Sequence, residues 1–482
     1  MTLRRDSREN ELLLFAALLT LESSFAAMAI ALYMKGARPF SVFLSTTPGK
    51  ASLFAGLACV LSIAVIIHQY VAGRRGPSRN FRMILAMNLI TVMLILSIGE
   101  IAVRAGSHMT PKGEIFGKVL LRPKNWDKIA DEYRPLLEQA SGDASYIQYD
   151  DLMGWTLEPN KSSSDGLYYS SAEGIRAPQV GISFAKDTEK TRIALVGDSF
   201  TFGEEVEYED TWGYRLEKDL GPDVEVLDFG VPGYSVGQAY LRYGKDVRDW
   251  HPKIVIFGLI SHDINRSLWV YPFLSAPDWK VPFSKPRHIL RQGRLVNINV
   301  PPLPPDSIFA RGSVLELPYL KYDRGYTPYD WEERFFHHSY LARLVVSIFP
   351  RWIAAQYDNT DKALVSVNAK ILKEFVRSAT QDGAIPLLVY FPSGIDLAST
   401  DSTDSLGRRV LQKAGLPYTD PTPCLLEVPS SARFAAGHHY SPQGNAAVAK
   451  CLAEVIREVL GHAPGEGRIP EQSMDGHKIA YR

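Results

Sequence analysis

The sequence RIALVGDSFTFG, residues 192–203, decides the expected fold. Its first five residues form an apolar run before a glycine, the pattern of a buried strand that ends in a turn. Ser199 follows directly, where that strand meets its first loop. Open α/β sheets place their ligands at this carboxyl edge of the strands. The stretch therefore predicts a strand that presents Ser199 as a candidate nucleophile.

Further apolar runs follow and alternate with helical segments. The expected strands are 192–196, 224–228, 254–259 and 385–391, and the expected helices are 211–220, 237–250, 364–379 and a last helix that ends at Leu460. Ser441 and Pro442 suit the N-cap and first turn of that last helix. Strands that alternate with helices indicate βαβ units, so we expect a three-layer α/β sandwich around a parallel sheet.

The bulk composition of the 482-residue chain excludes several classes of protein. Lys plus Arg equals Asp plus Glu, at 53 each, so no net charge would attract nucleic acid. The three cysteines show no zinc-ligand spacing, and we expect no metal and no cofactor. Cys424 and Cys451 can form a disulfide if the domain that holds them is exported, whereas Cys59 is interpreted as a small apolar residue.

Three apolar stretches near the N-terminus, 12–34, 51–71 and 83–103, are each long enough to cross a bilayer, which takes roughly 20 apolar residues. The connection 73–82 carries four arginines and no acid, so the positive-inside bias places it in the cytoplasm. With three crossings, everything after Arg104 then lies outside the cytoplasm. We expect a multi-pass cell-membrane protein whose C-terminal domain is extracytoplasmic, as a periplasmic domain is.

Charged residues within these stretches should have partners. Glu22, near the middle of the first span, is expected to face another helix or a polar crevice, because a carboxylate facing lipid is costly. Glu100 and Arg104, one turn apart, are expected to pair with each other at the end of the third span.

The pattern divides the chain into four parts. Residues 1–105 are the expected membrane anchor, 106–190 a linker and lead-in region, 191–462 the α/β domain, and 463–482 a disordered tail. An insertion, 266–361, is rich in proline and aromatic residues and interrupts the domain after its third strand. It is expected to be a lid or a substrate-binding subdomain, or else a structural excursion that packs on the membrane-proximal linker.

A second motif supplies a base for Ser199. The sequence GHHYSPQGN, residues 437–445, opens the last helix and contains His439. A serine hydroxyl becomes an effective nucleophile when a base takes its proton, and acyl transfer also needs donors aimed at the oxyanion. His439 is the expected general base. The backbone N–H groups of Ser199 and Gly233 are the expected oxyanion donors, since no side chain obstructs Gly233.

Together these blocks resemble the SGNH or GDSL hydrolases. The resemblance covers, in the family's order, the first block at 197–200, the second at 230–234, the position of the third at 258–263 and the fifth at 439–445. Residues 151–155, 159–160 and 174–176 resemble the lead-in of membrane-anchored members. The resemblance implies a flavodoxin-like sandwich that hydrolyses or transfers ester-linked acyl groups, often acetyl groups on polysaccharides.

Two positions depart from the family's pattern. The third block has His262 where the family has an asparagine that donates to the oxyanion; an imidazole N–H can also donate, or the site has lost its chemistry. The fifth block has Ala436 and Gly437 where an aspartate precedes the family's histidine. The group that orients His439 is left open between a backbone carbonyl and a distant acid, for which the candidates are Asp263, Asp420 and Glu427.

Two neighbours of the expected site have supporting roles. Asp198 is expected to fix the loop of Ser199 rather than act as an acid. His438 either lies on the surface beside His439 or contacts substrate.

The leading hypothesis is a membrane-anchored serine esterase or O-acyltransferase that acts on acylated glycans or other cell-envelope esters. Ser199 would attack the acyl carbonyl while His439 moves the proton. Three spans are few for a channel that carries activated acyl groups, so a transferase would need a separate membrane acyltransferase as partner, and hydrolysis is the simpler expectation. The alternative is a catalytically silent protein of the same fold that binds glycans or serves in assembly.

Overall fold

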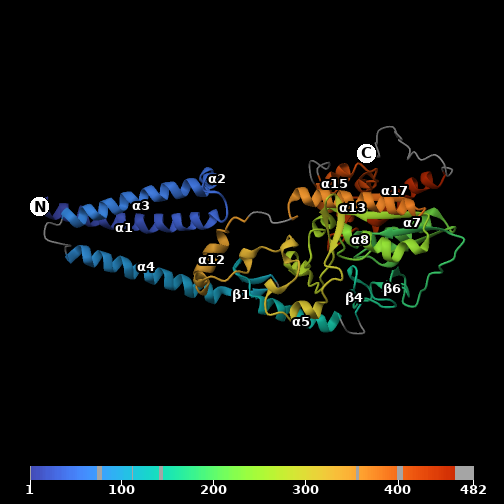
Figure 1. Cartoon of the computed structure of the whole chain (residues 1–482), viewed down its shortest axis with the longest axis horizontal. Coiled ribbons are helices and arrows are strands. Elements are labelled where there is room, and N and C mark those ends of the chain that lie inside the picture. Colours follow the sequence, from blue (N-terminus) through green and yellow to red (C-terminus); the bar gives the residue numbers. More distant parts are fainter. Residues whose placement is uncertain are drawn as a thin grey trace. The chain divides into compact units, whose positions relative to one another are not determined.

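The computed structural model describes residues 2–72, 79–110, 112–140, 145–353, 358–398 and 405–461 (Figure 1). The chain divides into two compact units, of which the first comprises Met1–Ile129 and Thr327–Ala355 and the second Ala130–Tyr326 and Gln356–Arg482. The tail expected at 463–482 lies outside the described residues, as do most residues of the arginine-rich connection 73–82.

The first unit contains the three expected spans. They are Glu11–Lys35, Thr47–Val71 and Arg82–Gly106, within helices α1 (Thr2–Lys35), α3 (Thr47–Ala72) and α4 (Arg79–Gly106). Each is long and apolar enough to cross a membrane, which confirms the prediction by length and composition. Helices α1 and α3 pack on each other, and Glu22 of α1 is half-buried rather than fully exposed.

Glu100 connects α4 to a segment more than two hundred residues away. It pairs with Arg104 at 2.9 Å, as expected. Its carboxylate also accepts hydrogen bonds from the Ser339 hydroxyl at 2.8 Å and from Tyr340 N at 3.0 Å, where helix α12 (Tyr340–Ile348) begins. The unit that holds the expected anchor therefore also holds residues 327–355 of the insertion.

The second unit is built on a parallel sheet. Its strands are β8 (Thr191–Val196), β9 (Val224–Asp228), β10 (Ile254–Leu259) and β13 (Ile385–Tyr390), in the order β13-β10-β8-β9. All pairs are parallel, and Thr419 continues the sheet beyond β13 with a parallel bridge to Val389. The strand order is that of flavodoxin-like folds, and the predicted strands agree with the observed ones within one residue.

Helices cover both faces of this sheet, which confirms the three-layer sandwich. One face packs against α8 (Val236–Arg242), α13 (Asp361–Gln381) and α15 (Leu406–Ala414), and the other against α7 (Trp212–Leu220) and α17 (Pro442–Gly461). Successive strand residues alternate between the two cores, as a pleated strand requires. In β8, Ala194 and Val196 join one core and Ile193 and Leu195 the other.

The helix expected at 237–250 is interrupted. After α8 ends at Arg242, a π-helical turn η2 (Tyr243–Val247) and a 3₁₀ turn η3 (Arg248–Trp250) complete the segment. A π turn shifts the register of the following side chains. Tyr243, Val247 and Trp250 of this segment are all buried.

The lead-in residues form two hairpins, one of which packs on the loop that follows β9. β4 (Ile147–Asp150) pairs with β5 (Gly154–Leu157), and β6 (Tyr169–Ser170) pairs with β7 (Arg176–Ala177). The Trp155 indole N–H donates to the Pro232 carbonyl at 3.1 Å, and the Tyr234 hydroxyl donates to the Trp155 carbonyl at 2.7 Å. The lead-in thus holds the loop that contains Gly233.

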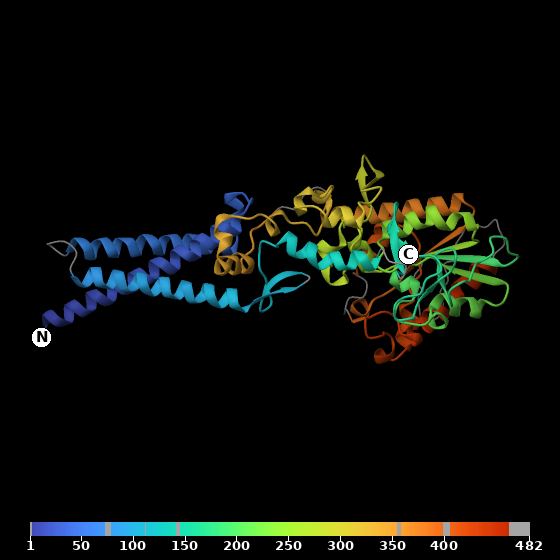
Figure 2. The ribbon, with the colours of Figure 1, turned by 90° about the horizontal axis from the view of Figure 1, so that it is seen from below.

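The insertion is divided between the units. Residues up to Tyr326 belong to the second unit and include the hairpin of β11 (Arg287–Arg291) and β12 (Arg294–Ile298). Gln292 and Gly293 both have positive φ, the conformation of a two-residue type I′ turn. Figure 2 shows the hairpin standing out beside α13, which it contacts.

The remaining elements are short, apart from α5. They are α2 (Phe40–Ser45), β1 (Ser107–Thr110), β2 (Gly113–Phe116), β3 (Val119–Leu120), α5 (Trp126–Ala140), α6 (Ser199–Phe202), α9 (Ser261–Arg266), α10 (Pro272–Ser275), α11 (Pro305–Phe309), α14 (Gly394–Ala398) and α16 (Thr422–Glu427), with 3₁₀ turns between them. Cys424 of α16 and Cys451 of α17 form a disulfide with 6.1 Å between their Cα atoms, which confirms that pairing.

Candidate active site

Ser199 begins the single-turn helix α6 directly after β8, and its side chain is almost fully buried. The Asp198 carboxylate caps this turn by accepting a hydrogen bond from Phe200 N at 2.9 Å. The Arg266 guanidinium holds the other oxygen of Asp198 at 3.2 Å. Asp198 therefore fixes the conformation of the loop that presents the Ser199 hydroxyl.

The turn of α6 ends at Gly203, whose left-handed backbone has a φ of 75°. A Cβ atom at this position would lie 2.5 Å from Thr211 Cγ2. Only glycine fits here, because it tolerates a left-handed backbone and has no Cβ atom to collide with Thr211. The chain then reverses and brings Glu204 and Glu205 back beside Ser199.

His439 reaches Ser199 from the far end of the sequence. Its Nε2 atom lies 2.9 Å from Ser199 Oγ, although the two residues are 240 positions apart. The Ser441 hydroxyl accepts from Gly444 N at 3.1 Å and caps α17, which fixes the chain just after the imidazole. The two residues that the sequence analysis paired are within hydrogen-bond distance.

Glu205 supplies the acid that the sequence analysis did not find. Its Oε2 atom lies 2.9 Å from His439 Nδ1, and the same carboxylate accepts hydrogen bonds from the backbone N–H groups of His439 and Gly437. Burial alone would raise the pKa of Glu205, but these hydrogen bonds outweigh it and lower the pKa. The carboxylate is therefore held in its charged form against the imidazole.

The three acids proposed from the sequence are engaged elsewhere. Asp263 binds Arg266 at 2.8 Å, Asp420 binds Arg408 at 2.7 Å, and Glu427 lies 3.5 Å from Lys450. The only signal for Glu205 in the sequence is a pair of acids, five and six residues after the nucleophile, at the end of an apolar turn. A backbone carbonyl is not needed to orient the imidazole.

The backbone of Glu205 is held in an uncommon conformation. Its φ is 71°, in the left-handed region that residues other than glycine rarely adopt. The Glu205 N–H donates to the Tyr168 hydroxyl at 2.8 Å. Strained residues of this kind persist where surrounding contacts over-determine them, often at functional sites. Tyr168, from the lead-in, is one such contact.

The hydrogen bonds assign the protonation of the imidazole. Since the carboxylate of Glu205 can only accept, His439 Nδ1 carries the proton, and Nε2 accepts from the Ser199 hydroxyl. This serine, histidine and acid arrangement is the one that activates serine nucleophiles on several unrelated folds. A second carboxyl, of Glu204, lies 3.4 Å from Nε2, and burial raises its pKa.

The expected oxyanion donors lie on two loops that contact each other. Val231 N donates to the Gly197 carbonyl at 3.2 Å, which joins the loop of Gly233 to the loop of Ser199. Gly233 has a φ of 80°, which favours glycine. Within the described part of the chain, neither Ser199 N nor Gly233 N donates to another protein atom. Both N–H groups are thus free for a ligand oxygen.

The other expected residues surround this centre without contacting its hydrogen-bond chain. His262 lies at the start of α9, where desolvation of the ring and the nearby Arg266 cation lower its pKa, which favours the neutral imidazole. Asp263 is buried and structural, since it binds Arg266. His438 is exposed and has a φ of 78°. Among the residues that the structure describes, no group of three or more His, Cys, Asp or Glu is arranged to hold a metal ion.

No protein-family model and no curated protein sequence matches the chain. Its fold is similar to a mutant of an acetyl-xylooligosaccharide esterase from Geobacillus, at 14% identity over 59% of this chain and 100% of that one, with a TM-score of 0.30. It is also similar to a two-domain esterase active on acetylated mannans, at 12% identity over 57% and 51% of the two chains and a TM-score of 0.30.

A third similar structure is a GDSL-like lipase from Bacteroides thetaiotaomicron. The identity is 9%, the match covers 57% of this chain and 93% of the other, and the TM-score is 0.29. Similarities of this size concern the fold, so the function must be judged from the geometry around Ser199.

Proposed function

We propose that this chain is a membrane-anchored serine esterase of the SGNH type. The observation that carries the proposal is the continuous hydrogen-bond chain from Ser199 Oγ through both nitrogens of His439 to the carboxylate of Glu205. A buried hydroxyl, an imidazole and a carboxylate hydrogen-bonded in this order form the arrangement that supports nucleophilic attack on an acyl carbonyl.

In the first half of the reaction, Ser199 Oγ attacks the ester carbonyl carbon while His439 Nε2 takes the hydroxyl proton. The N–H groups of Ser199 and Gly233 would donate to the oxygen on which negative charge develops. The tetrahedral intermediate then loses the alcohol, which receives the proton from Nε2. Glu205 stabilises the imidazolium throughout, because its carboxylate remains hydrogen-bonded to Nδ1.

In the second half, water attacks the acyl-enzyme. His439 Nε2 takes a proton from that water and returns it to Ser199 Oγ as the carboxylic acid leaves. An O-acyltransferase would use the same acyl-enzyme and replace the water by a sugar hydroxyl, with acyl groups delivered by a separate membrane acyltransferase. Hydrolysis needs no such partner and is the function we propose.

The proposed substrates are ester-linked acyl groups, above all acetyl groups, on extracytoplasmic glycans or other envelope esters. The indole of Trp279 is 41% exposed, and a Cβ atom on Gly233 would lie 3.9 Å from it. The Arg266 guanidinium lies over this ring, and the part of the ring that stays exposed beside the oxyanion loop suits the apolar face of a sugar ring. The apolar spans and the Cys424–Cys451 disulfide support an extracytoplasmic domain, since disulfides persist in oxidising compartments.

The alternative of a silent glycan-binding or assembly protein rests on the missing family aspartate and on His262 in place of the family asparagine. The position of Glu205 beside His439 counters the first of these two reasons. A fluorophosphonate probe tests the choice. Incubation with the full-length chain in detergent should add the probe mass at Ser199 and not in a Ser199→Ala variant. A chain that stays unlabelled while a known serine esterase in the same tube is labelled would favour the binding protein.

The topology is tested separately. Reporter fusions after Gly106 should give an extracytoplasmic signal, and a cytoplasmic signal would reverse the proposed orientation. A panel of acetylated glycans and simple acyl esters, with Ser199→Ala as control, identifies the substrate.

A further inference from the structure

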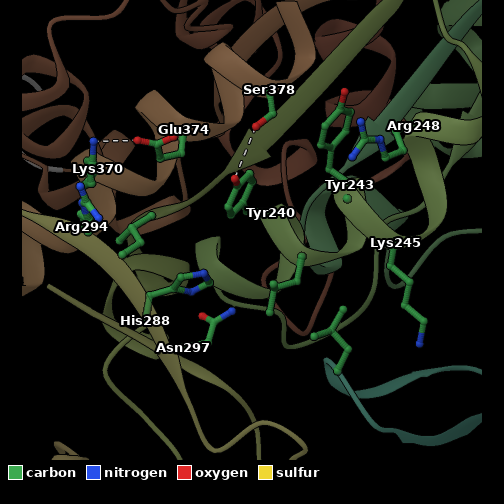
Figure 3. A pocket seen from close by; sticks show the side chains of 14 residues that line it. Tyr240, Tyr243, Lys245, Arg248, His288, Arg294, Asn297, Lys370, Glu374 and Ser378 are labelled. Atoms are coloured by element: carbon green, nitrogen blue, oxygen red, sulfur yellow. Dashed lines mark hydrogen bonds and ion pairs between the residues drawn. The ribbon is translucent and has the colours of Figure 1, made fainter. Parts of the chain in front are cut away.

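A cavity lies away from the residues of the proposed reaction. It has a volume of about 700 Å³, is open to solvent on one side, and is bordered by α8 with η2, by α13, and by the hairpin β11–β12 (Figure 3). Its lining includes none of Ser199, Glu205 and His439. A volume of this size accommodates a small ligand of one or two sugar rings, because ligand pockets span roughly 300–1,000 Å³.

The hairpin directs unpaired polar groups into this cavity. His288 of β11 lies directly opposite Asn297 of β12 in the register, and both line the cavity. The His288 side chain is only 5% exposed. Within the described residues, neither side chain has a hydrogen-bond partner, whereas the neighbouring Tyr240 and Ser378 hydroxyls lie 3.5 Å apart (Figure 3). A buried polar side chain without a partner is unusual in a folded protein.

The lining also carries positive charge that the protein does not neutralise. Arg294, at the turn of the hairpin, is exposed and has no carboxylate partner in the described part of the chain. Lys370 lies 2.7 Å from Glu374, but Glu374 also lies 2.7 Å from Arg377, so two cations share one carboxylate. The cavity therefore attracts an anionic group at the Arg294 and Lys370 side.

The inner side of the cavity is neutral and aromatic. Burial, reinforced by the Lys285 cation, lowers the pKa of His288 to about 3. The imidazole is therefore uncharged, with one N–H donor and one acceptor. Its ring lies 6.1 Å from that of Tyr240. A donor, an acceptor and an amide beside an aromatic ring match the hydroxyls and apolar face of a sugar.

We infer that this cavity is a second, non-catalytic binding site for an acidic sugar, a ring that bears a carboxylate or a phosphate. His288 and Asn297 bind its hydroxyls, Tyr240 contacts the ring, and Arg294 with Lys370 binds the anion. The site does not depend on the proposed esterase reaction. Were the chain an esterase, such a site would hold an acidic glycan while Ser199 acts elsewhere on it.

The test measures binding alone. The Ser199→Ala full-length chain in detergent is titrated with cellobiuronic acid, glucose 6-phosphate and neutral cellobiose, and binding is followed by ligand-detected NMR. At least one acidic probe should bind saturably, and at least about tenfold more tightly than cellobiose. The acidic probe that binds identifies the anion. Equal affinity for the neutral and acidic probes, or no saturable binding of either acidic probe, would overturn the inference.

Variants locate the site. Arg294→Gln should weaken binding of the acidic probe by about tenfold. Arg291→Gln is its matched control, because Arg291 is bound to Asp358 outside the cavity lining, and it should bind like the parent. Asn297→Trp keeps the charge but fills the cavity from an exposed strand position, and it should abolish binding. If Arg294→Gln or Asn297→Trp binds like the parent, the site lies elsewhere.

Discussion

Gly437 and Glu205 are fitted to each other: a Cβ atom on Gly437 would lie 2.7 Å from the Glu205 carboxyl carbon. In the family that the sequence blocks resemble, an aspartate precedes the histidine at this point of the chain. Here the position has no side chain, and a carboxylate from the loop after the nucleophile occupies the space. The acid meets the same imidazole nitrogen but comes from a different part of the sequence.

This fit predicts that Gly437→Ala lowers activity more than stability. The added methyl group must displace the Glu205 carboxylate, the mobile end of a side chain, so the fold adapts at little cost. The misplaced acid should lower kcat by about 100-fold, as displacements of about 1 Å do. The rates of ester hydrolysis and the thermal unfolding of the Gly437→Ala variant and the parent are compared. Gly461→Ala, which meets only open space, is the control, and an unchanged kcat in Gly437→Ala would contradict the fit.

Glu205→Gln should remove the charge that stabilises the imidazolium. In serine proteases, replacing the orienting acid by its amide lowers turnover by about 10⁴-fold. We expect a loss of similar order in kcat with little change in KM, measured on a soluble acetyl ester. Glu207→Gln, at an exposed position two residues after Glu205, should retain full activity. A Glu205→Gln variant that is as active as the parent would show that His439 does not need this acid.

Tyr168→Phe should lower kcat indirectly, through the backbone of Glu205. The hydroxyl accepts from Glu205 N, and its loss leaves that N–H unpaired at a cost of about 1 kcal/mol. We expect kcat to fall about fivefold, while the cation–π contact of the ring with Arg176 remains. Tyr169→Phe changes the neighbouring ring and serves as control. Equal kcat values for the two variants would show that the lead-in does not support the acid.

Asp228 should make the stability of the fold depend on pH. Burial raises its pKa to about 7, above the unfolded value of about 3.9. The protonated carboxyl therefore stabilises the fold fully below that unfolded value, and this contribution is lost as pH rises toward 7. Relative to the parent, Asp228→Asn should gain about 1.4 kcal/mol per pH unit between about pH 4 and 7, and nothing further above.

Thermal unfolding of both chains at several pH values measures this gain. Asp223→Asn, at an exposed position before the same strand, should follow the parent. Parallel curves for Asp228→Asn and the parent would show that Asp228 is already charged in the folded chain at low pH.

The disulfide should stabilise the second unit. Cys424 and Cys451 enclose a segment with a sequence separation of 27, and breaking such a link costs about 3 kcal/mol. The Cys424→Ser, Cys451→Ser double variant should therefore unfold at a lower temperature. Alkylation of the denatured parent should modify Cys59 alone before reduction and all three cysteines after it. Three modified cysteines without reductant would contradict the pairing.

The fold was largely predictable because its signals are local. Each core strand is a short apolar run between turn residues, and 224–228 and 254–259 were placed without error. The π turn at Tyr243 was not predictable, since it depends on which side chains the core buries. The division of the insertion at Tyr326 and Thr327 likewise depends on long-range contacts, such as those of Glu100 with the start of α12.

Two of the three residues of the candidate site could be predicted from the sequence. Ser199 and His439 lie in recognisable blocks at element ends, so their meeting follows from the topology. Glu205 could not be predicted, because its role depends on a left-handed backbone at a residue that is not glycine. That conformation is imposed by Tyr168, by the turn at Gly203 and by the N–H groups around His439, none of which is a property of the loop sequence alone.

The origins of the three side chains set an order of assembly. The nucleophile and its acid emerge from the ribosome within the same short turn, whereas the base arrives roughly 230 residues later with the last helix of the sandwich. A growing chain thus carries Ser199 without its base while the residues between Ser199 and His439 are made. In the proposed mechanism, the Ser199 hydroxyl becomes reactive only when α17 docks and brings His439 to it.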